Sequence, residues 1–115
     1  MFDIFYARKK YMCVTFGTMN GVIEYLWDCG LHPNKWYLEG KEVIFKGGPT
    51  GIEVVHWETP EGVDEKEADK KSLEWSRKVC EANVKAEYGD TDQEMIEGKV
   101  ELEMLLKERP TYTVR

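Results

Sequence analysis

The chain has 115 residues, a formal net charge of −6 at pH 7, and 42% hydrophobic residues that include four Trp, six Tyr and four Phe. This length is typical of one domain. A domain of this size buries roughly two-thirds of its unfolded surface, so it needs neither a metal nor a disulfide for stability. The net negative charge disfavours direct binding to nucleic-acid phosphates, which requires clustered positive charge.

The charge is unevenly distributed along the chain. Residues 60–109 contain 15 Asp or Glu against 9 Lys or Arg, whereas residues 1–59 are nearly neutral. We therefore expect a single domain, 1–115, with three parts. Residues 1–59 form a sheet with one short helix, residues 60–109 form an acidic helical pair, and residues 110–115 form a tail.

Two strands are expected first, over residues 2–8 and 11–16. In the second, the alternation places Met12, Val14 and Phe16 on one face. The sequence Arg8-Lys9-Lys10 between them lacks the Gly or Asn that favours a tight hairpin. One long bent strand is therefore an alternative to two paired strands.

A short helix is expected next. Thr18 or Asn20 can cap its start, and Gly30 followed by Pro33 ends it. At helical spacing, one face is formed by Val22, Leu26 and Cys29.

Three more strands follow, over residues 36–38, 42–45 and 52–57. The first two are joined by the short turn Glu39-Gly40-Lys41, and the last two by a flexible glycine-rich loop, residues 47–51. Connections this short imply antiparallel pairing.

The remaining chain has the start and stop signals of two long helices. Asp64 is a cap for a helix that reaches Tyr88, and Thr91 with Glu94 forms a capping box for a helix to about Arg109. The predicted fold is thus α+β: an antiparallel sheet of about five strands, in the order strand–strand–helix–strand–strand–strand–helix–helix, with both long helices packed on it.

Both long helices have a second apolar line. In the first, Leu73, Cys80, Val84 and Tyr88 lie nearly opposite the line that contains Trp75, Val79 and Ala82. In the last, the second line is Ile96, Val100 and Met104. If one apolar line of each helix packs on the sheet, the other line is left without a covering element. This predicts partner binding or a homo-oligomer through the C-terminal helices.

A small-ligand or nucleotide site is one functional hypothesis. Glycine lets backbone N–H groups approach a phosphate closely, and aromatic side chains exposed on a sheet are typical of binding surfaces. The residues concerned are Trp36, Tyr37, Lys46, Gly47, Gly48, Thr50, His56 and Trp57. The competing interpretation is a simple hairpin connection, with the second face of the sheet covered by the N-terminal helix.

Catalysis and metal binding have weak support. Cys29 with His32, and Cys13 with His56, are the pairs from which a zinc site or a thiol–imidazole dyad would have to be built. We expect no metal, no cofactor and no catalytic residues, with a small His-based enzyme as the third hypothesis.

The three cysteines are expected to be reduced and buried. The basic cluster at residues 8–10 follows the apolar stretch, which is the wrong order for a signal peptide, so a cytoplasmic location is expected.

The favoured hypothesis is a non-catalytic protein-binding module that presents an acidic helical surface to a nucleic-acid-handling enzyme. The surface would be formed by Glu87, Asp90, Asp92, Glu94, Glu97, Glu101 and Glu103. Small size, acidity and the lack of a catalytic motif are common among accessory proteins of phages and mobile elements, so an anti-defence or anti-nuclease inhibitor is its concrete form. That likeness is one of composition only.

Overall fold

A computed structural model describes residues 1–6 and 13–112. It confirms the α+β prediction, with a five-stranded antiparallel sheet and three α-helices in the described residues. In chain order the elements are β1 (Phe2–Tyr6), β2 (Val14–Phe16), α1 (Met19–Asp28), the 3₁₀ turn η1 (Pro33–Lys35), β3 (Trp36–Glu39), β4 (Glu42–Phe45), β5 (Gly48–His56), α2 (Glu65–Tyr88) and α3 (Asp92–Lys107).

The strand order in the sheet is β2-β1-β5-β4-β3. β1 occupies an interior position because Ile4 pairs with Val14 on one side and with Val54 on the other. Since β1 and β2 pair antiparallel, the alternative of one long bent strand is wrong. The expected strand ends at residues 8 and 11, the Arg8-Lys9-Lys10 connection and Met12 lie outside the described residues.

One face of the sheet carries the hydrophobic core, and α1 packs on it. Thr18 caps α1 by accepting a hydrogen bond from the Gly21 amide at 3.2 Å. Val22 and Leu26 are fully buried, as the helical spacing predicts. Cys29 is exposed, contrary to the prediction, because the helix ends at Asp28 and Cys29 is its C-cap.

The strand β5 begins at Gly48, four residues before the predicted start. Lys46 and Gly47 alone form the turn, with φ of 51° and 79°, the positive values of a two-residue hairpin turn. Phe45 pairs directly with Gly48. Gly51, at φ 75°, lies in a β5 segment whose register with β4 shifts between Glu42 and Ile44. The predicted flexible loop is therefore largely strand.

Both long helices begin as predicted. The Asp64 carboxylate accepts hydrogen bonds from the Lys66 and Glu67 amides. At α3, Thr91 accepts from the Glu94 amide at 3.2 Å, and the Glu94 carboxylate accepts from the Asp90 amide at 2.9 Å. The Thr91 half of the predicted capping box is present, whereas the Glu94 carboxylate bonds the amide of the residue before the cap rather than that of Thr91 itself.

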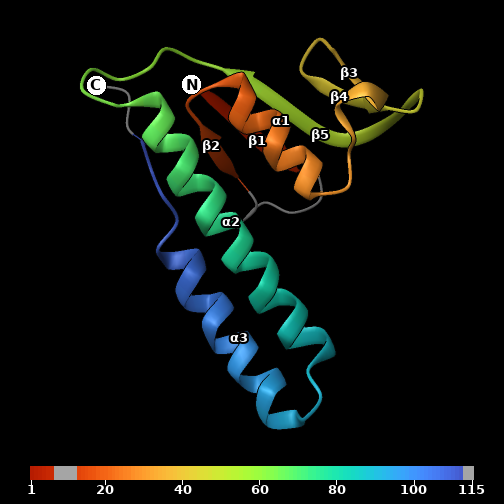
Figure 1. Ribbon diagram of the computed structural model, residues 1–115, viewed down its shortest axis with the longest axis vertical. Helices are drawn as coiled ribbons and strands as arrows, with labels where there is room; N and C mark the ends of the chain where they lie inside the picture. The colour runs from red at the N-terminus through yellow and green to blue at the C-terminus, as the bar shows by residue number, and fades with distance from the viewer. Residues whose placement is uncertain (7–12, 113–115) are drawn as a thin grey trace.

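The helices α2 and α3 form an antiparallel hairpin (Figure 1). The first half of α2 packs on the sheet beside α1, and its second half, with the start of α3, projects beyond the sheet. At the sheet end, Leu102, Leu105 and Leu106 contact the core, and the Trp75 indole N–H donates to the Leu105 carbonyl at 2.6 Å. In the described part of the chain, no helix has both the length and the apolar content to cross a bilayer.

Candidate functional site

The hairpin is held together by a close approach of its two backbones. Ala82 and Ala86 of α2 are buried, and Gly98 is the buried residue of α3. A Cβ atom on Gly98 would lie 2.5 Å from the Ala86 nitrogen, so only glycine fits there. These residues mark the inner face of each helix.

Apolar side chains also occupy the outer faces. Val84 lies two residues from both Ala82 and Ala86, about 200° around the helix, so it points away from α3. We call Cys80, Val84 and Tyr88 the α2 outer face. Ile96 and Val100 have the same relation to Gly98, and Met104, about 120° around the helix from Gly98, follows Val100 by one turn. We call Ile96, Val100 and Met104 the α3 outer face; Met104 also borders the groove beside it. All six residues are exposed, which agrees with the second apolar lines expected from the sequence.

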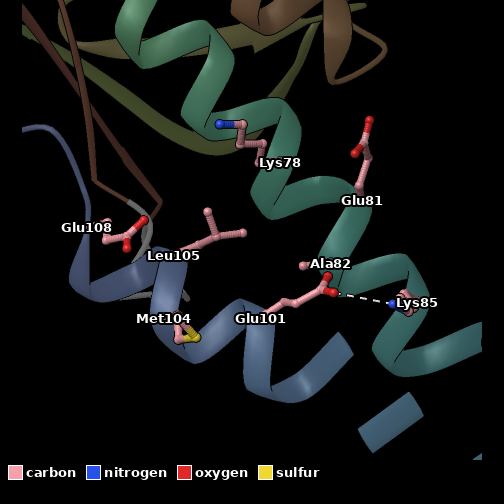
Figure 2. Close-up of a pocket in the computed structure, with 8 residues that line it drawn as sticks. All are labelled: Lys78, Glu81, Ala82, Lys85, Glu101, Met104, Leu105 and Glu108. Carbon is pink, nitrogen blue, oxygen red and sulfur yellow. Dashed lines mark hydrogen bonds and ion pairs between the residues drawn. The ribbon is translucent and has the colours of Figure 1, made fainter. Parts of the chain in front are cut away.

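A groove of about 500 Å³ runs along one side of the hairpin (Figure 2). Its lining residues come from both helices: Lys78, Glu81, Ala82, Lys85, Glu101, Met104, Leu105 and Glu108. The Lys85 ammonium pairs with Glu101 at 3.3 Å and with Glu97 at 3.4 Å. The hydrogen bond to Glu101, together with the neighbouring Glu97, raises the pKa of Lys85. The lining contains no imidazole, thiol or serine hydroxyl.

The predicted acidic residues do not form one surface. Glu97 and Glu101 are paired with Lys85, and the Glu94 carboxylate is bonded to the Asp90 amide at the start of α3. Glu103 lies two residues from Glu101, on nearly the opposite side of the helix. Glu87, Asp90 and Asp92 are exposed around the tip of the hairpin, and within residues 1–6 and 13–112 they form no ion pair.

The residues of the predicted ligand site are widely separated. Tyr37 is opposite Ile44, which in turn is opposite Pro49 of β5. His56 lies seven residues further along β5, on the order of 20 Å away at about 3.3 Å per residue. Lys46 and Gly47 are the β4–β5 turn, Gly48 and Thr50 are in β5, and the Thr50 hydroxyl donates to the Val43 carbonyl at 2.6 Å.

Of the two aromatic pairs, Trp36 and Tyr37 lie on opposite faces of the sheet. Trp36 packs against the core, whereas Tyr37 is exposed. His56 stacks on Phe2, with ring centroids 4.7 Å apart, and Trp57 is half-buried. Among the described residues, the Trp36 and Trp57 indole nitrogens are buried without a hydrogen-bond partner.

The second face of the sheet is not covered by the N-terminal helix. The buried residues of α1 belong to the same core cluster as Ile4 and Val54. On the other face, Phe5 is opposite Glu53, and both are exposed. The expectation that α1 covers this face is therefore wrong.

The thiols and imidazoles are also dispersed. Cys13, Cys29 and Cys80 are free, and none is buried, contrary to the expectation of burial. The Cys29 sulfur is 3.6 Å from the Tyr6 hydroxyl, and partial burial raises the pKa of this thiol. His32 is the cap of η1, and its Nδ1 accepts from the Asn34 amide at 3.2 Å. In the part of the chain that the structure describes, no group of three His, Cys, Asp or Glu residues could hold a metal.

Sequence reasoning identified the two outer faces but missed the groove. The groove depends on which turns of α2 and α3 lie beside each other. The small residues Ala86 and Gly98 were the available signal, because small residues mark positions where two helices approach closely.

Comparison with known proteins identifies no relative: no family model, curated protein or solved structure matches the chain.

Proposed function

We propose that this chain is a non-catalytic protein-binding module whose projecting α2–α3 hairpin contacts a partner protein. The observation that carries this proposal is the set of large apolar side chains on the outer faces of the hairpin. Tyr88 is 76% exposed, and Ile96 and Met104 are each 57% exposed. Each outer face is a line of exposed apolar side chains, and exposed apolar surface of this kind is typical of interaction sites.

The finer form of the proposal is an inhibitor of a nucleic-acid-handling enzyme, such as a phage or mobile-element protein that acts against a host nuclease. Glu87, Asp90 and Asp92 at the hairpin tip support it, because exposed carboxylates can occupy a basic groove that normally holds phosphates. A cytoplasmic location belongs to the same proposal and is supported by the three free cysteines.

The test is affinity capture from nuclease-treated host lysate, followed by mass spectrometry. The hairpin variant replaces Val84, Tyr88, Ile96, Val100 and Met104 with Ser. Its matched control replaces Phe5 and Tyr37, which are exposed apolar residues on the sheet. We expect a stoichiometric partner to be captured by the wild type and the control and lost by the hairpin variant.

Circular dichroism establishes that each variant is folded. Capture of the same partner by a folded hairpin variant would contradict the proposal. The inhibitor form is tested separately, by assaying the captured enzyme with the wild type and with a variant in which Glu87, Asp90 and Asp92 are replaced by Lys. Full inhibition by the reversed variant would contradict the inhibitor form alone.

A further inference from the structure

The α2 outer face continues the side of α2 on which α1 packs. Arg77 lies two turns before Val84, and its guanidinium bonds Glu24 and Asp28 of α1, each at 2.9 Å. α1 ends at Asp28. Past that point Val84 and Tyr88 remain 50% and 76% exposed. This side of α2 therefore holds one helix along its first half and presents an uncovered apolar line along its second.

The spacing of that line matches another helix. Cys80, Val84 and Tyr88 follow one another at four-residue intervals, about 6 Å apart along the axis. Side chains at this interval form a ridge that fits the groove between ridges of a second helix. An extended peptide would instead need the free edge of a sheet for its backbone hydrogen bonds, and the α2 outer face provides none.

The charged residues beside this apolar line indicate which charge the partner helix should carry. Arg77 and Lys85 are already paired, Arg77 with α1 and Lys85 with Glu97 and Glu101. Lys78, the third basic residue nearby, lies about 120° around the helix from Val84 and lines the groove instead. Glu81 and Glu87 flank the line, are exposed, and form no ion pair in the described residues. Glu81 and Glu87 each lie about 60° around the helix from Val84, so the unpaired charge nearest the line is negative, which favours Lys or Arg on the partner.

We propose that the α2 outer face binds an amphipathic α-helix of the partner that has an apolar stripe flanked by basic residues. This inference rests on the proposed function and specifies the chemistry of the partner. The bound helix lies beyond the end of α1, on the same side of α2, with its apolar residues against Val84 and Tyr88 and its basic residues beside Glu81 and Glu87.

The test uses two designed 18-residue helical peptides labelled with fluorescein. Both have Leu at every core position; one has Lys and the other has Glu at the flanking positions. Binding to the full chain is measured by fluorescence anisotropy at about 0.15 M salt, where surface charges more than ~8 Å apart are largely screened. We expect the Leu/Lys peptide to bind at least about tenfold more tightly than the Leu/Glu peptide.

Two variants locate the binding. Replacing Val84 and Tyr88 with Ser, or reversing Glu81 and Glu87 to Lys, should weaken Leu/Lys binding at least about tenfold. The matched control reverses Glu39 and Glu53, two exposed carboxylates on the sheet. It has the same net charge as the other reversal and should change binding by less than about twofold. Amide NMR shifts on peptide addition should be largest over residues 80–88.

No binding of the Leu/Lys peptide, equal binding of the Leu/Glu peptide, or equal weakening by the control reversal would overturn the inference. Lysate capture distinguishes failure of this inference from failure of the proposed function. If lysate capture is lost when Ile96 and Val100 are replaced but survives replacement of Val84 and Tyr88, the hairpin is the binding element and the α2 outer face is not.

Discussion

Asp69 of α2 binds Thr18, the residue that caps α1, through both the backbone amide and the hydroxyl of Thr18. The same carboxylate accepts a hydrogen bond from the Gly17 amide at 2.8 Å. A Cβ atom on Gly21 would lie 2.3 Å from the Asp69 carboxylate. The first turn of α1 and the beginning of α2 are thereby fixed to each other at one half-buried site.

Replacement of Asp69 with Ala should lower the free energy of unfolding by about 2–3 kcal/mol. The reason is that the change removes hydrogen bonds to a charged group and leaves two backbone amides without their partner. Urea denaturation monitored by circular dichroism measures the effect. Asp92→Ala is the control, since Asp92 is exposed and should change stability by less than about 0.5 kcal/mol. Equal stability of the two variants would contradict this role for Asp69.

Replacement of Gly98 with Ala should destabilise the protein by about 1–3 kcal/mol. In an unconstrained helix the same change stabilises by about 1 kcal/mol. The sign of the change in the free energy of unfolding therefore shows whether the two helices are in close contact at Gly98. Here the added methyl group would overlap the backbone of Lys85 and Ala86. Gly48→Ala is the control, because its nearest atom would be the Phe45 oxygen at 3.8 Å. A stabilised Gly98→Ala protein would show that the helices are further apart than described.

The Trp75 indole connects the two long helices near the sheet. Trp75→Phe keeps most of the apolar contact but removes the 2.6 Å hydrogen bond to the Leu105 carbonyl. We expect a loss of about 1 kcal/mol, against 3–5 kcal/mol for Trp75→Ala, which also leaves a cavity. Thermal and urea unfolding of both variants measure the difference. An identical loss in both variants would mean that packing contributes little.

The phenols of Tyr6 and Tyr25 should make stability fall at alkaline pH. Burial raises the pKa of both, with the Tyr6–Tyr25 contact adding to the rise at Tyr25; their hydroxyl oxygens are 2.7 Å apart. In the unfolded chain these groups ionise near the ordinary value of 10.0. Above that pH the folded protein retains protons that the unfolded chain releases, so stability decreases as pH rises.

Urea denaturation between pH 8 and pH 11 tests this expectation. Stability should be nearly constant below about pH 9, and each buried phenol should add a slope approaching 1.4 kcal/mol per pH unit above pH 10. Tyr25→Phe should reduce the alkaline slope while leaving the behaviour near pH 8 unchanged. A wild-type profile that stays flat to pH 11 would contradict the assigned burial.

The helix boundaries could be predicted because their signals are local. Thr18, Asp64 and Thr91 each accept a hydrogen bond from an amide two or three residues ahead, so the cap and the group that it satisfies lie in one short segment of sequence. The second apolar lines were predictable for the same reason, because helical periodicity alone places Val84 and Val100 away from the inner faces.

The features that could not be predicted from the sequence depend on distant residues. Pro49 and Gly51 disfavour a strand locally, yet pairing with β4 makes residues 48–51 part of β5. Glu97 and Glu101 both pair with Lys85, which is more than ten residues away in sequence. The face of the sheet that α1 covers is decided by the single cluster that it shares with β1, β5 and α2. None of these follows from local pattern.

The helix α2 contains neither glycine nor proline over its 24 residues, so it has no built-in hinge and spans about 36 Å. Its first half is anchored by Asp69 and Trp75, and its second half carries the exposed face. The helix α2 therefore forms a rigid connection between the sheet and the hairpin tip. A protein bound near Tyr88 would be held at one fixed orientation to the sheet, and a load applied at the tip would be transmitted to the Asp69–Thr18 contact.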